Sequence, residues 1–526
     1  MRIAALDLGS NSFHLLVVDA ASDGSLVPVL REKEMLRLGA VVSRQGWIPP
    51  EAADRAVATV SRLVMLARSA GSSELIVCAT AALRQADNGA EVVERIAAEV
   101  DVTVDVLSGT EEARLVFEGV RASMHLEPSP ALCLDLGGGS LEVMVGSSAG
   151  LERSTSVDLG VARLWAELVR NDPLSKQDLR RLRERAEDTL VPVVEAMDVR
   201  NPALAVGTGG TARDLARLVA ARRDPAIALG PALAVPPPVE QRSISRAELL
   251  AVHDELLAAP AADRLRFPGI DAGRVETVPV GAIVLVTAME LFGFDELTVS
   301  RWGLREGMVL EALGRLSPGT RAKAAVPYDG RRVSVVDLAQ RCHADPARGD
   351  QVARLALALF DQTQVLHGLG PEDRQLLEYA ALLHHIGRHV SIDAAHKHSA
   401  YLVQHGQLRG FSPEEVATMA ALARYHRGSD PKPGHEPFRS LSSPRQAAVV
   451  AQAALLRVAA GLDTGHRSVV SDLDVDLDGE TVVVTVEGSQ GLDLALWGAR
   501  RERQLFEKTF GRRIEFEAVV PSRRAG

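Results

Sequence analysis

The sequence has 526 residues, of which 46% are apolar and 24% charged, and its formal net charge is −10. This length is too great for one domain and predicts roughly three to four, with the composition of an ordinary globular protein. The negative charge argues against general nucleic-acid binding, and no apolar run approaches the ~20 residues of a transmembrane segment. Only three cysteines occur, without disulfide or metal spacing. We therefore expect a cytoplasmic protein.

A repeated pattern lies within the first third of the chain. Residues 3–18 read IAALDLGSNSFHLLVV, and residues 131–146 read ALCLDLGGGSLEVMVG. Each copy predicts a β-hairpin whose tight turn carries an Asp, glycine backbone and a Ser. Such turns bring backbone N–H groups close to an anion, and the Asp can hold a divalent cation. One copy would more often be an ordinary surface turn, whereas two with the same spacing indicate a duplicated domain with two phosphate loops facing one cleft.

A third glycine-rich stretch follows at residues 204–218, which read LAVGTGGTARDLARL. The pattern predicts a strand, a glycine turn and a helix that Thr211 caps. The N-terminus of a helix is a favourable place for a phosphate or nucleotide because its dipole and free N–H groups attract anions. The stretch lacks the Lys of a Walker loop and does not fit GxGxxG.

Two Asp-Gly hairpins and a later Gly-Gly-Thr loop resemble the acetate kinase, sugar kinase, Hsp70 and actin superfamily. Within it, the sequence is similar to the exopolyphosphatase/guanosine pentaphosphate phosphohydrolase (Ppx/GppA) phosphatase family. The matching stretches are DLGSNSFHLLV (7–17), ATAALR (79–84), SGTEEARLVFEGV (108–120), DLGGGSLEVMVG (135–146), VDLGVARL (157–164), AVGTGGTARDL (205–215) and VSRWGLREGM (299–308).

The resemblance implies a hydrolase that removes the terminal phosphate of inorganic polyphosphate or guanosine pentaphosphate. It also implies Mg²⁺ as cofactor, K⁺ as a candidate activator, and a homodimer. The two activities share one catalytic apparatus, so the motifs do not separate them. Because the chain is acidic overall, a polyanionic substrate requires a local concentration of positive charge.

The implied fold class is α/β: a duplicated two-lobed module of the actin/Hsp70/sugar-kinase (ribonuclease H-like) type. An all-α HD-like domain and a small α+β cap are expected to follow, the cap reading as hairpin, helix and strand. The expected boundaries are 1–125 for lobe I with the catalytic Glu, 126–315 for lobe II, 325–468 for the helical domain and 469–526 for the cap.

Hydrolysis of a phosphoanhydride needs a positioned water and charge neutralisation more than covalent chemistry. By resemblance, Glu112 is the base that deprotonates the water, although a Glu pair beginning a helix can also merely complement its dipole. Asp135 and Glu142 are expected to hold Mg²⁺ or its waters. His14 alternates with apolar residues, so we expect a packed or hydrogen-bonded core His. The expected phosphate-binding residues are Asp7, Gly9, Ser10, Asn11, Ser12, Arg84, Gly137, Gly138, Gly139, Ser140, Gly209, Gly210 and Thr211.

The helical segment resembles the HD phosphohydrolase fold in YAALLHHIGRHVS (379–391), HKHSAYLV (396–403), ARYHRG (423–428) and LLRVAAGLD (455–463). A working HD site needs a His, a His-Asp pair and a distal Asp. Here the pair is His384-His385, the first His is missing, and only Asp463 remains, which predicts no competent two-metal centre. Basic residues of this segment instead suggest a channel for a phosphate chain, with unrelated solvated faces as the alternative: Arg388, His389, Lys397, His398, Arg427 and Lys432.

Two other function classes stay open. A kinase or ATPase of the same superfamily would use the glycine turn at 207–211 for adenosine, but the Glu111-Glu112 pair fits water better as the acceptor. A non-enzymatic alarmone sensor would bind without turnover, which the retained carboxylates Glu112, Asp135 and Glu142 make less favourable.

Overall fold

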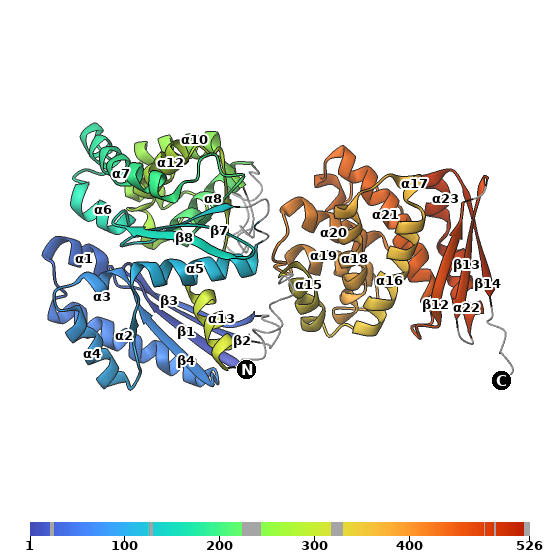
Figure 1. Ribbon diagram of the computed structural model, residues 1–526, viewed down its shortest axis with the longest axis horizontal. Coiled ribbons are helices and arrows are strands. Elements are labelled where there is room, and N and C mark those ends of the chain that lie inside the picture. Colours follow the sequence, from blue (N-terminus) through green and yellow to red (C-terminus); the bar gives the residue numbers. More distant parts are fainter. Residues whose placement is uncertain are drawn as a thin grey trace. The chain divides into compact units, whose positions relative to one another are not determined.

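The computed structural model describes residues 1–20, 26–124, 126, 130–223, 243–316, 330–477, 479–488 and 491–519. The chain divides into two compact units, Met1–Gly330 and Arg331–Gly526, which are treated separately below (Figure 1). Across the described ranges, every helix is too short or too polar to cross a membrane. The expected start of the helical domain, at 325, falls outside the described residues.

The first unit begins with a five-stranded sheet in the order β3-β2-β1-β4-β5. Its first three strands are antiparallel, and β4 and β5 run parallel to β1. Leu- and Val-rich runs make the inner strands buried on both faces, as expected for a sheet covered by helices. The elements are β1 (Arg2–Leu8), β2 (Ser12–Ala20), β3 (Leu26–Met35), β4 (Glu74–Ala79), β5 (Asp105–Val106), α1 (Leu38–Gln45), α2 (Pro50–Ser69), α3 (Ala81–Gln85) and α4 (Gly89–Val100).

A second sheet repeats this order, because β8-β7-β6-β9-β11 follows the same connectivity, with β10 added at the edge. The expected duplication is therefore visible in the strand topology as well as in the motifs. The elements are β6 (Ala131–Leu136), β7 (Leu141–Ser147), β8 (Gly150–Val157), β9 (Leu204–Thr208), β10 (Ser243–Ser245), β11 (Glu296–Val299), α6 (Val161–Leu168), α7 (Lys176–Met197), α8 (Gly209–Arg223), α10 (Arg246–Ala258), α11 (Ala261–Arg264), η1 (Ala272–Arg274) and α12 (Val278–Phe292).

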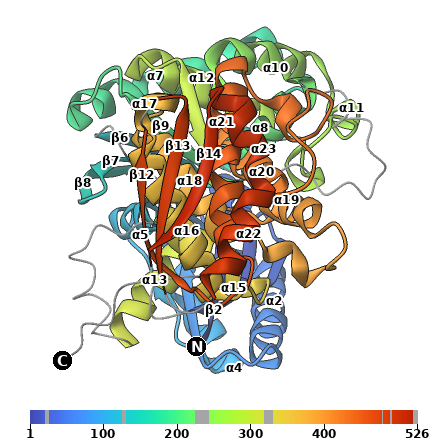
Figure 2. The same ribbon diagram turned by 90° about the vertical axis from the view of Figure 1, so that its right-hand side faces the viewer.

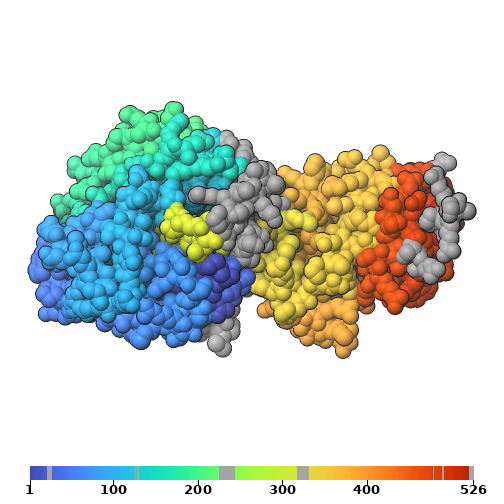
Figure 3. Space-filling model, turned by 60° about the horizontal axis from the view of Figure 1, so that its bottom comes forward, coloured from blue at the N-terminus to red at the C-terminus, as the bar shows by residue number. Residues whose placement is uncertain are grey.

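Two helices cross between the lobes. Helix α13 (Leu304–Leu316) packs its Val309 and Leu313 against the β1–β2 face of lobe I, and its yellow-green surface lies beside the blue N-terminal region (Figure 3). Helix α5 (Gly109–Ser123) shares a core with β6 and β7 of lobe II through Phe117. Each of these helices therefore packs an apolar face against the sheet of the other half of the unit, which chain order does not reveal.

These two helices touch backbone to backbone through glycines. A Cβ atom built on Gly307 of α13 would lie 1.9 Å from the carbonyl oxygen of Leu115 in α5, and one on Gly119 would lie 2.4 Å from the carbonyl oxygen of Gly303. Real Cβ atoms do not approach backbone oxygen this closely, and backbone cannot give way as a flexible side chain does. The crossing thus requires a residue without a side chain at both positions.

The second unit is a helical bundle with a three-stranded sheet, β12-β13-β14, and one continuous core contains residues of both (Figure 2). The expected hairpin, helix and strand of the tail are present. The elements are α15 (Gly330–Arg341), α16 (Pro346–Gln362), α17 (Gln364–His367), α18 (Pro371–Leu383), η2 (Ile386–His389), α19 (Ala395–His405), α20 (Pro413–Tyr425), η3 (Phe438–Ser440), α21 (Ser443–Leu462), β12 (Val470–Asp476), β13 (Thr481–Gly488), α22 (Leu492–Glu502), α23 (Gln504–Phe510) and β14 (Arg513–Val519).

The glycine contact between α5 and α13 gives a stability prediction. Gly307→Ala should destabilise the first unit by about 1–3 kcal/mol, since the added methyl group overpacks a rigid contact. Gly314→Ala in the same helix is the control, because a Cβ there meets no atom within 4 Å. That variant should gain up to about 1 kcal/mol from helix propensity. Thermal unfolding compares the two, and equal melting temperatures would contradict the packing argument.

Candidate active site

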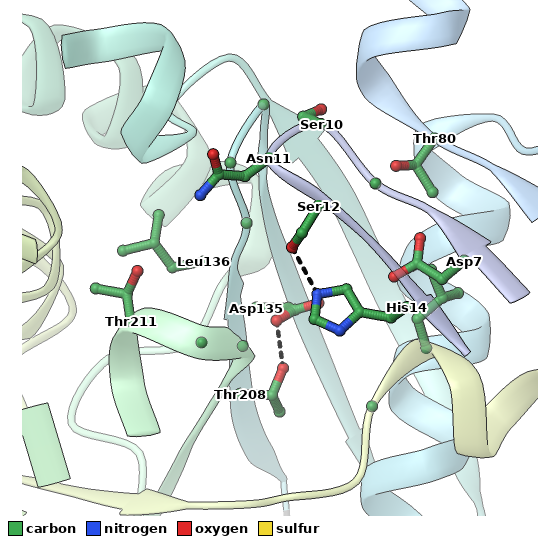
Figure 4. Close-up of a pocket in the computed structure, with 18 of the residues that line it drawn as sticks. Asp7, Ser10, Asn11, Ser12, His14, Thr80, Asp135, Leu136, Thr208 and Thr211 are labelled. Atoms are coloured by element: carbon green, nitrogen blue, oxygen red, sulfur yellow. Dashed lines mark hydrogen bonds between the residues drawn. The ribbon is translucent and has the colours of Figure 1, made fainter. Parts of the chain in front are cut away.

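A cavity lies where the two hairpin turns meet the start of helix α8 (Figure 4). Its walls come from the β1–β2 turn of lobe I, the β6–β7 turn of lobe II, the first residues of α8 and the N-terminal end of α13. Most of the expected site residues line it: Asp7, Gly9, Ser10, Asn11, Ser12, Glu112, Asp135, Gly137, Gly138, Gly139, Ser140, Gly209, Gly210 and Thr211.

Two expected site residues do not line the cavity. Arg84 donates to the carbonyl oxygen of Leu107 at 2.5 Å and to Oε2 of Glu112 at 3.2 Å, so its guanidinium lies behind that carboxylate. Glu142 is 1% exposed and lies one strand behind Asp135, its cross-strand partner. Each residue therefore neighbours a carboxylate that lines the cavity, Arg84 that of Glu112 and Glu142 that of Asp135.

The two turns need glycine because they touch each other. A Cβ on Gly139 would lie 2.5 Å from Oγ of Ser10, and one on Gly138 would lie 3.2 Å from the backbone nitrogen of Asn11. The glycines of both turns keep ordinary negative or extended φ angles, whereas Gly209 has φ +87°. Close approach, rather than backbone conformation, is thus what these turns require.

The start of helix α8 differs from the sequence expectation. The helix begins at Gly209, so Thr211 lies within its first turn and does not cap it. Thr211 is buried and still lines the cavity, together with the first two residues of the helix. The free backbone N–H groups of this turn therefore belong to the cavity wall, a typical arrangement for binding an anion.

The glutamate pair of α5 is divided between two tasks. Glu111 completes a capping box with Ser108: its backbone N–H donates to the Ser108 hydroxyl, and its carboxylate accepts from the Ser108 N–H at 2.8 Å. Glu112 is 8% exposed and lines the cavity. Burial, with a further contribution from Glu142, raises the pKa of Glu112 well above its ordinary value, while Arg84 opposes the shift. A carboxylate held in this way is suited to accept a proton.

Further carboxylates gather around Glu112. Thr208 donates its hydroxyl to Oδ1 of Asp135 at 2.5 Å, and Ser156 donates to Glu142 at 2.8 Å (Figure 4 shows the first bond). Burial raises the pKa of Asp135, and it raises the pKa of both Asp7 and Glu142 to about 7. Oδ1 of Asp7 is buried without a hydrogen-bond partner in the described chain. Buried carboxylates at this density call for a cation.

The donor set suits Mg²⁺, which takes oxygen ligands and keeps several waters when it binds phosphates through one or two carboxylates. Among the described residues, no three His, Cys, Asp or Glu side chains lie close enough together to form a complete metal site. Asp135, with Glu142 behind it, therefore fits a cation that completes its shell with water and substrate oxygens.

The sequence interpretation missed four arginines that line the cavity: Arg213, Arg274, Arg301 and Arg305. Burial, together with Arg274 and Arg305, lowers the pKa of Arg213 to about 9, which reflects how densely the positive charge is gathered. Arg213, Arg301 and Arg305 occur inside the quoted motifs AVGTGGTARDL and VSRWGLREGM, so the need for local positive charge could have identified them. Nothing in the sequence around Arg274 indicated its place.

His14 is hydrogen-bonded, as expected, but it also belongs to the cavity wall. Its Nε2 lies 2.7 Å from Oγ of Ser12 (Figure 4). Burial and the charges of Arg305, Arg213, Lys33 and Arg274 lower its pKa well below the ordinary value. The imidazole is therefore neutral at physiological pH.

Known proteins share both the sequence and the fold of the first unit. The chain is 34% identical over 321 residues to exopolyphosphatase 1 of Mycobacterium tuberculosis (strain ATCC 25618 / H37Rv), a match of 61% of this chain and 90% of that protein. It is 28% identical over 425 residues to the guanosine-5'-triphosphate,3'-diphosphate pyrophosphatase of Vibrio vulnificus (strain YJ016), with 81% and 80% covered.

Solved structures give the same result. An exopolyphosphatase from Cytophaga hutchinsonii ATCC 33406 aligns with TM-score 0.55 and 28% identity over 60% of this chain and 98% of that one. The Aquifex aeolicus member of the Ppx/GppA family aligns with TM-score 0.51 and 26% identity over the same shares. The model of the Ppx/GppA phosphatase family matches residues 17–316, and that of Ppx/GppA phosphatase, domain III matches residues 331–490. The chain belongs to the Ppx/GppA phosphatase family.

Proposed function

We propose that this protein is a phosphoanhydride hydrolase, an exopolyphosphatase that releases orthophosphate from the end of inorganic polyphosphate. The observation that carries the proposal is the buried carboxylate of Glu112, which lines a cavity shared with two glycine-rich turns and four arginines. Relatives named exopolyphosphatase and guanosine-5'-triphosphate,3'-diphosphate pyrophosphatase support the substrate class and make guanosine pentaphosphate the second candidate substrate.

The proposal extends to the fold of the module. Two sheets with the shared order 3-2-1-4-5, each starting with a hairpin whose turn faces the cavity, support an actin-like two-lobed assignment. In such a fold a ligand binds between the lobes, where the turns of both copies converge. The terminal phosphoryl group would lie against the turns at 9–12 and 137–140, with the arginines neutralising the chain behind it.

In the proposed mechanism, Glu112 accepts a proton from a water molecule while the water oxygen attacks the terminal phosphorus. The bond from this phosphorus to the bridging oxygen breaks, and the shortened chain leaves with that oxygen. Arg84 holds the Glu112 carboxylate from behind and counteracts the effect of burial on its pKa. When bound, Mg²⁺ would be held by Asp135, with Glu142 on the adjacent strand adding negative charge, and would neutralise charge on the phosphate oxygens. Backbone N–H groups of the turns orient the phosphoryl group.

Replacing Glu112 tests the proposal directly. Glu112→Gln should lower phosphate release from long-chain polyphosphate by about 10²–10⁴-fold in the presence of Mg²⁺, because a general base contributes on that order. Glu111→Gln is the matched control. Gln at this position can still complete the capping box with Ser108, so both activity and stability should persist.

A parallel assay with guanosine pentaphosphate decides the preferred substrate. Faster release from that compound would keep the mechanism and change the main role. Binding of either compound without any phosphate release by the wild-type protein would refute the hydrolase proposal in favour of a sensor.

Arg84 gives a pH prediction. The ionised form of Glu112 is the active base, so the rate falls as the pH drops below the Glu112 pKa. Because Arg84 lowers that pKa, Arg84→Met should raise it further and move the acidic limb of the kcat–pH profile to higher pH. Arg84→Lys, which keeps a positive charge, should move it less. An unchanged limb with a raised KM would instead mean that Arg84 contacts the substrate.

We also propose that the second unit is a degenerate HD-like domain whose surface guides long phosphate chains. His384, His385 and Asp463 are each buried in this unit, and no metal-binding group of three His, Cys, Asp or Glu side chains occurs in the described part of the chain. Of the basic side chains expected to form the channel, Arg388, Lys397, Arg427 and Lys432 are exposed, and among the described residues no carboxylate lies within 4.0 Å of them.

The combined variant Lys397→Gln/Arg427→Gln should slow hydrolysis of long-chain polyphosphate and weaken its dependence on salt, because fewer phosphates are neutralised. Turnover of tripolyphosphate, which is too short to extend far from the active site, should remain. Arg439→Gln removes an exposed arginine of the same unit that is paired with Glu436 and serves as the control. Equal losses on short and long chains would exclude a guiding role.

A further inference from the structure

The duplication places matching rows of side chains across the two sheets. In lobe I, the strand register brings Asp7 opposite His14 and His14 opposite Lys33. In lobe II, the same positions carry another row, because Asp135 lies opposite Glu142, and Glu142 opposite Ser156. His14 is therefore the structural counterpart of Glu142, and Lys33 is the counterpart of Ser156.

The two rows differ in charge. The lobe II row contains two carboxylates and a neutral hydroxyl. The lobe I row contains one carboxylate, a neutral imidazole and an ammonium group, and the ammonium of Lys33 also contacts Asp271 at 2.7 Å. Arg305 acts electrostatically on His14, Asp7 and Asp135, and Arg213 acts on His14 and Asp135. Both arginines add positive charge to the shared cavity. A cation is thus favoured beside the lobe II row, and an anion beside the lobe I row.

The turn serines follow the same division. A carboxylate can only accept hydrogen bonds, so Ser140 donates its proton to Glu142. A neutral imidazole can donate through Nε2–H instead. When His14 donates to Oγ of Ser12, which lies 2.7 Å from Nε2, the Ser12 hydroxyl keeps its own proton for a further acceptor. Both Ser12 and His14 line the cavity, so a phosphoryl oxygen is the acceptor that this geometry provides.

We infer that His14 is a positioning residue. It does not transfer a proton in the reaction, and it orients the Ser12 hydroxyl so that this hydroxyl donates to the phosphate chain. The duplicated turns are thereby specialised, the first for the phosphoryl anion through Ser12 and His14, the second for the cation through Asp135 and Glu142. This inference rests on the proposed function, because it assigns the phosphate-binding side of the same cavity.

Replacements of different hydrogen-bonding capacity test the role of His14. His14→Leu removes the donor at similar volume and should raise the KM for polyphosphate roughly five- to tenfold with little change in kcat, the loss of about one hydrogen bond. The Kd of tripolyphosphate, measured by calorimetry in the Glu112→Gln background, should rise equally. His14→Gln keeps an N–H at the position of Nε2 and should return both constants to within about twofold of the wild type.

A double-mutant cycle separates positioning from a general structural effect. If His14 acts through Ser12, then Ser12→Ala alone should raise the KM for polyphosphate as much as His14→Leu does. The combined variant should then have the same KM as Ser12→Ala. His14→Asn, whose shorter amide does not reach Ser12, retains a polar side chain at the buried position. It provides a second test variant and should behave like His14→Leu.

Three results would each overturn the inference. They are additive increases of KM in the cycle, a KM of His14→Gln as high as that of His14→Leu, and a fall in kcat with unchanged Kd. The proposed function fails separately, if the wild-type protein releases no phosphate from polyphosphate or guanosine pentaphosphate. Wild-type turnover together with unchanged KM in His14→Leu would refute the positioning role alone.

Discussion

The site depends on the close contact between the two glycine turns. A Cβ atom on Gly139 would lie 2.5 Å from Oγ of Ser10, and one on Gly138 would lie 3.2 Å from the backbone nitrogen of Asn11, so the two turns meet without room for side chains at these glycines. Asp7 and Asp135 stand one residue before the ends of the strands that lead into these turns, and desolvation there raises the pKa of both. The same packing that makes the cavity therefore also produces its perturbed carboxylates.

Burying carboxylates together is unfavourable unless opposite charge compensates. The chain supplies that charge partly from guanidinium groups, with Arg84 behind Glu112 and Arg305 near Asp7. Although the protein is acidic overall, positive charge is thus gathered at the cavity. The remaining negative charge, on Asp135 and Glu142, is what favours a bound cation.

The crossing helices connect this electrostatic arrangement to the fold. Helix α5 starts beside the cavity, where Ser108 and Glu111 form its capping box and Glu112 lines the cavity, and the helix continues across the core of lobe II. Helix α13 brings Arg305 to the cavity from the far end of the module and then packs on lobe I. The close contact at Gly119 and Gly307 holds these two helices against each other, and with them the positions of Glu112 and Arg305. A change in their packing would therefore displace Glu112 and Arg305 together.

Duplication gives the two turns the same backbone but not the same side chains. Equivalent positions hold His14 in one lobe and Glu142 in the other, and the strand register makes the equivalence unambiguous. The two lobes therefore carry different charges at one equivalent position, an imidazole in lobe I and a carboxylate in lobe II.

The sequence alone determined the repeated hairpins, the third glycine stretch, the family and most of the cavity lining, since all of these are encoded in short, local patterns. It could not decide that Glu111 caps the helix while Glu112 faces the cavity, because adjacent residues differ only in the direction they take on the folded helix. It also missed Arg274 and the exchange of α5 and α13 between lobes. Those features depend on contacts between segments far apart in the chain, which only the tertiary structure brings together.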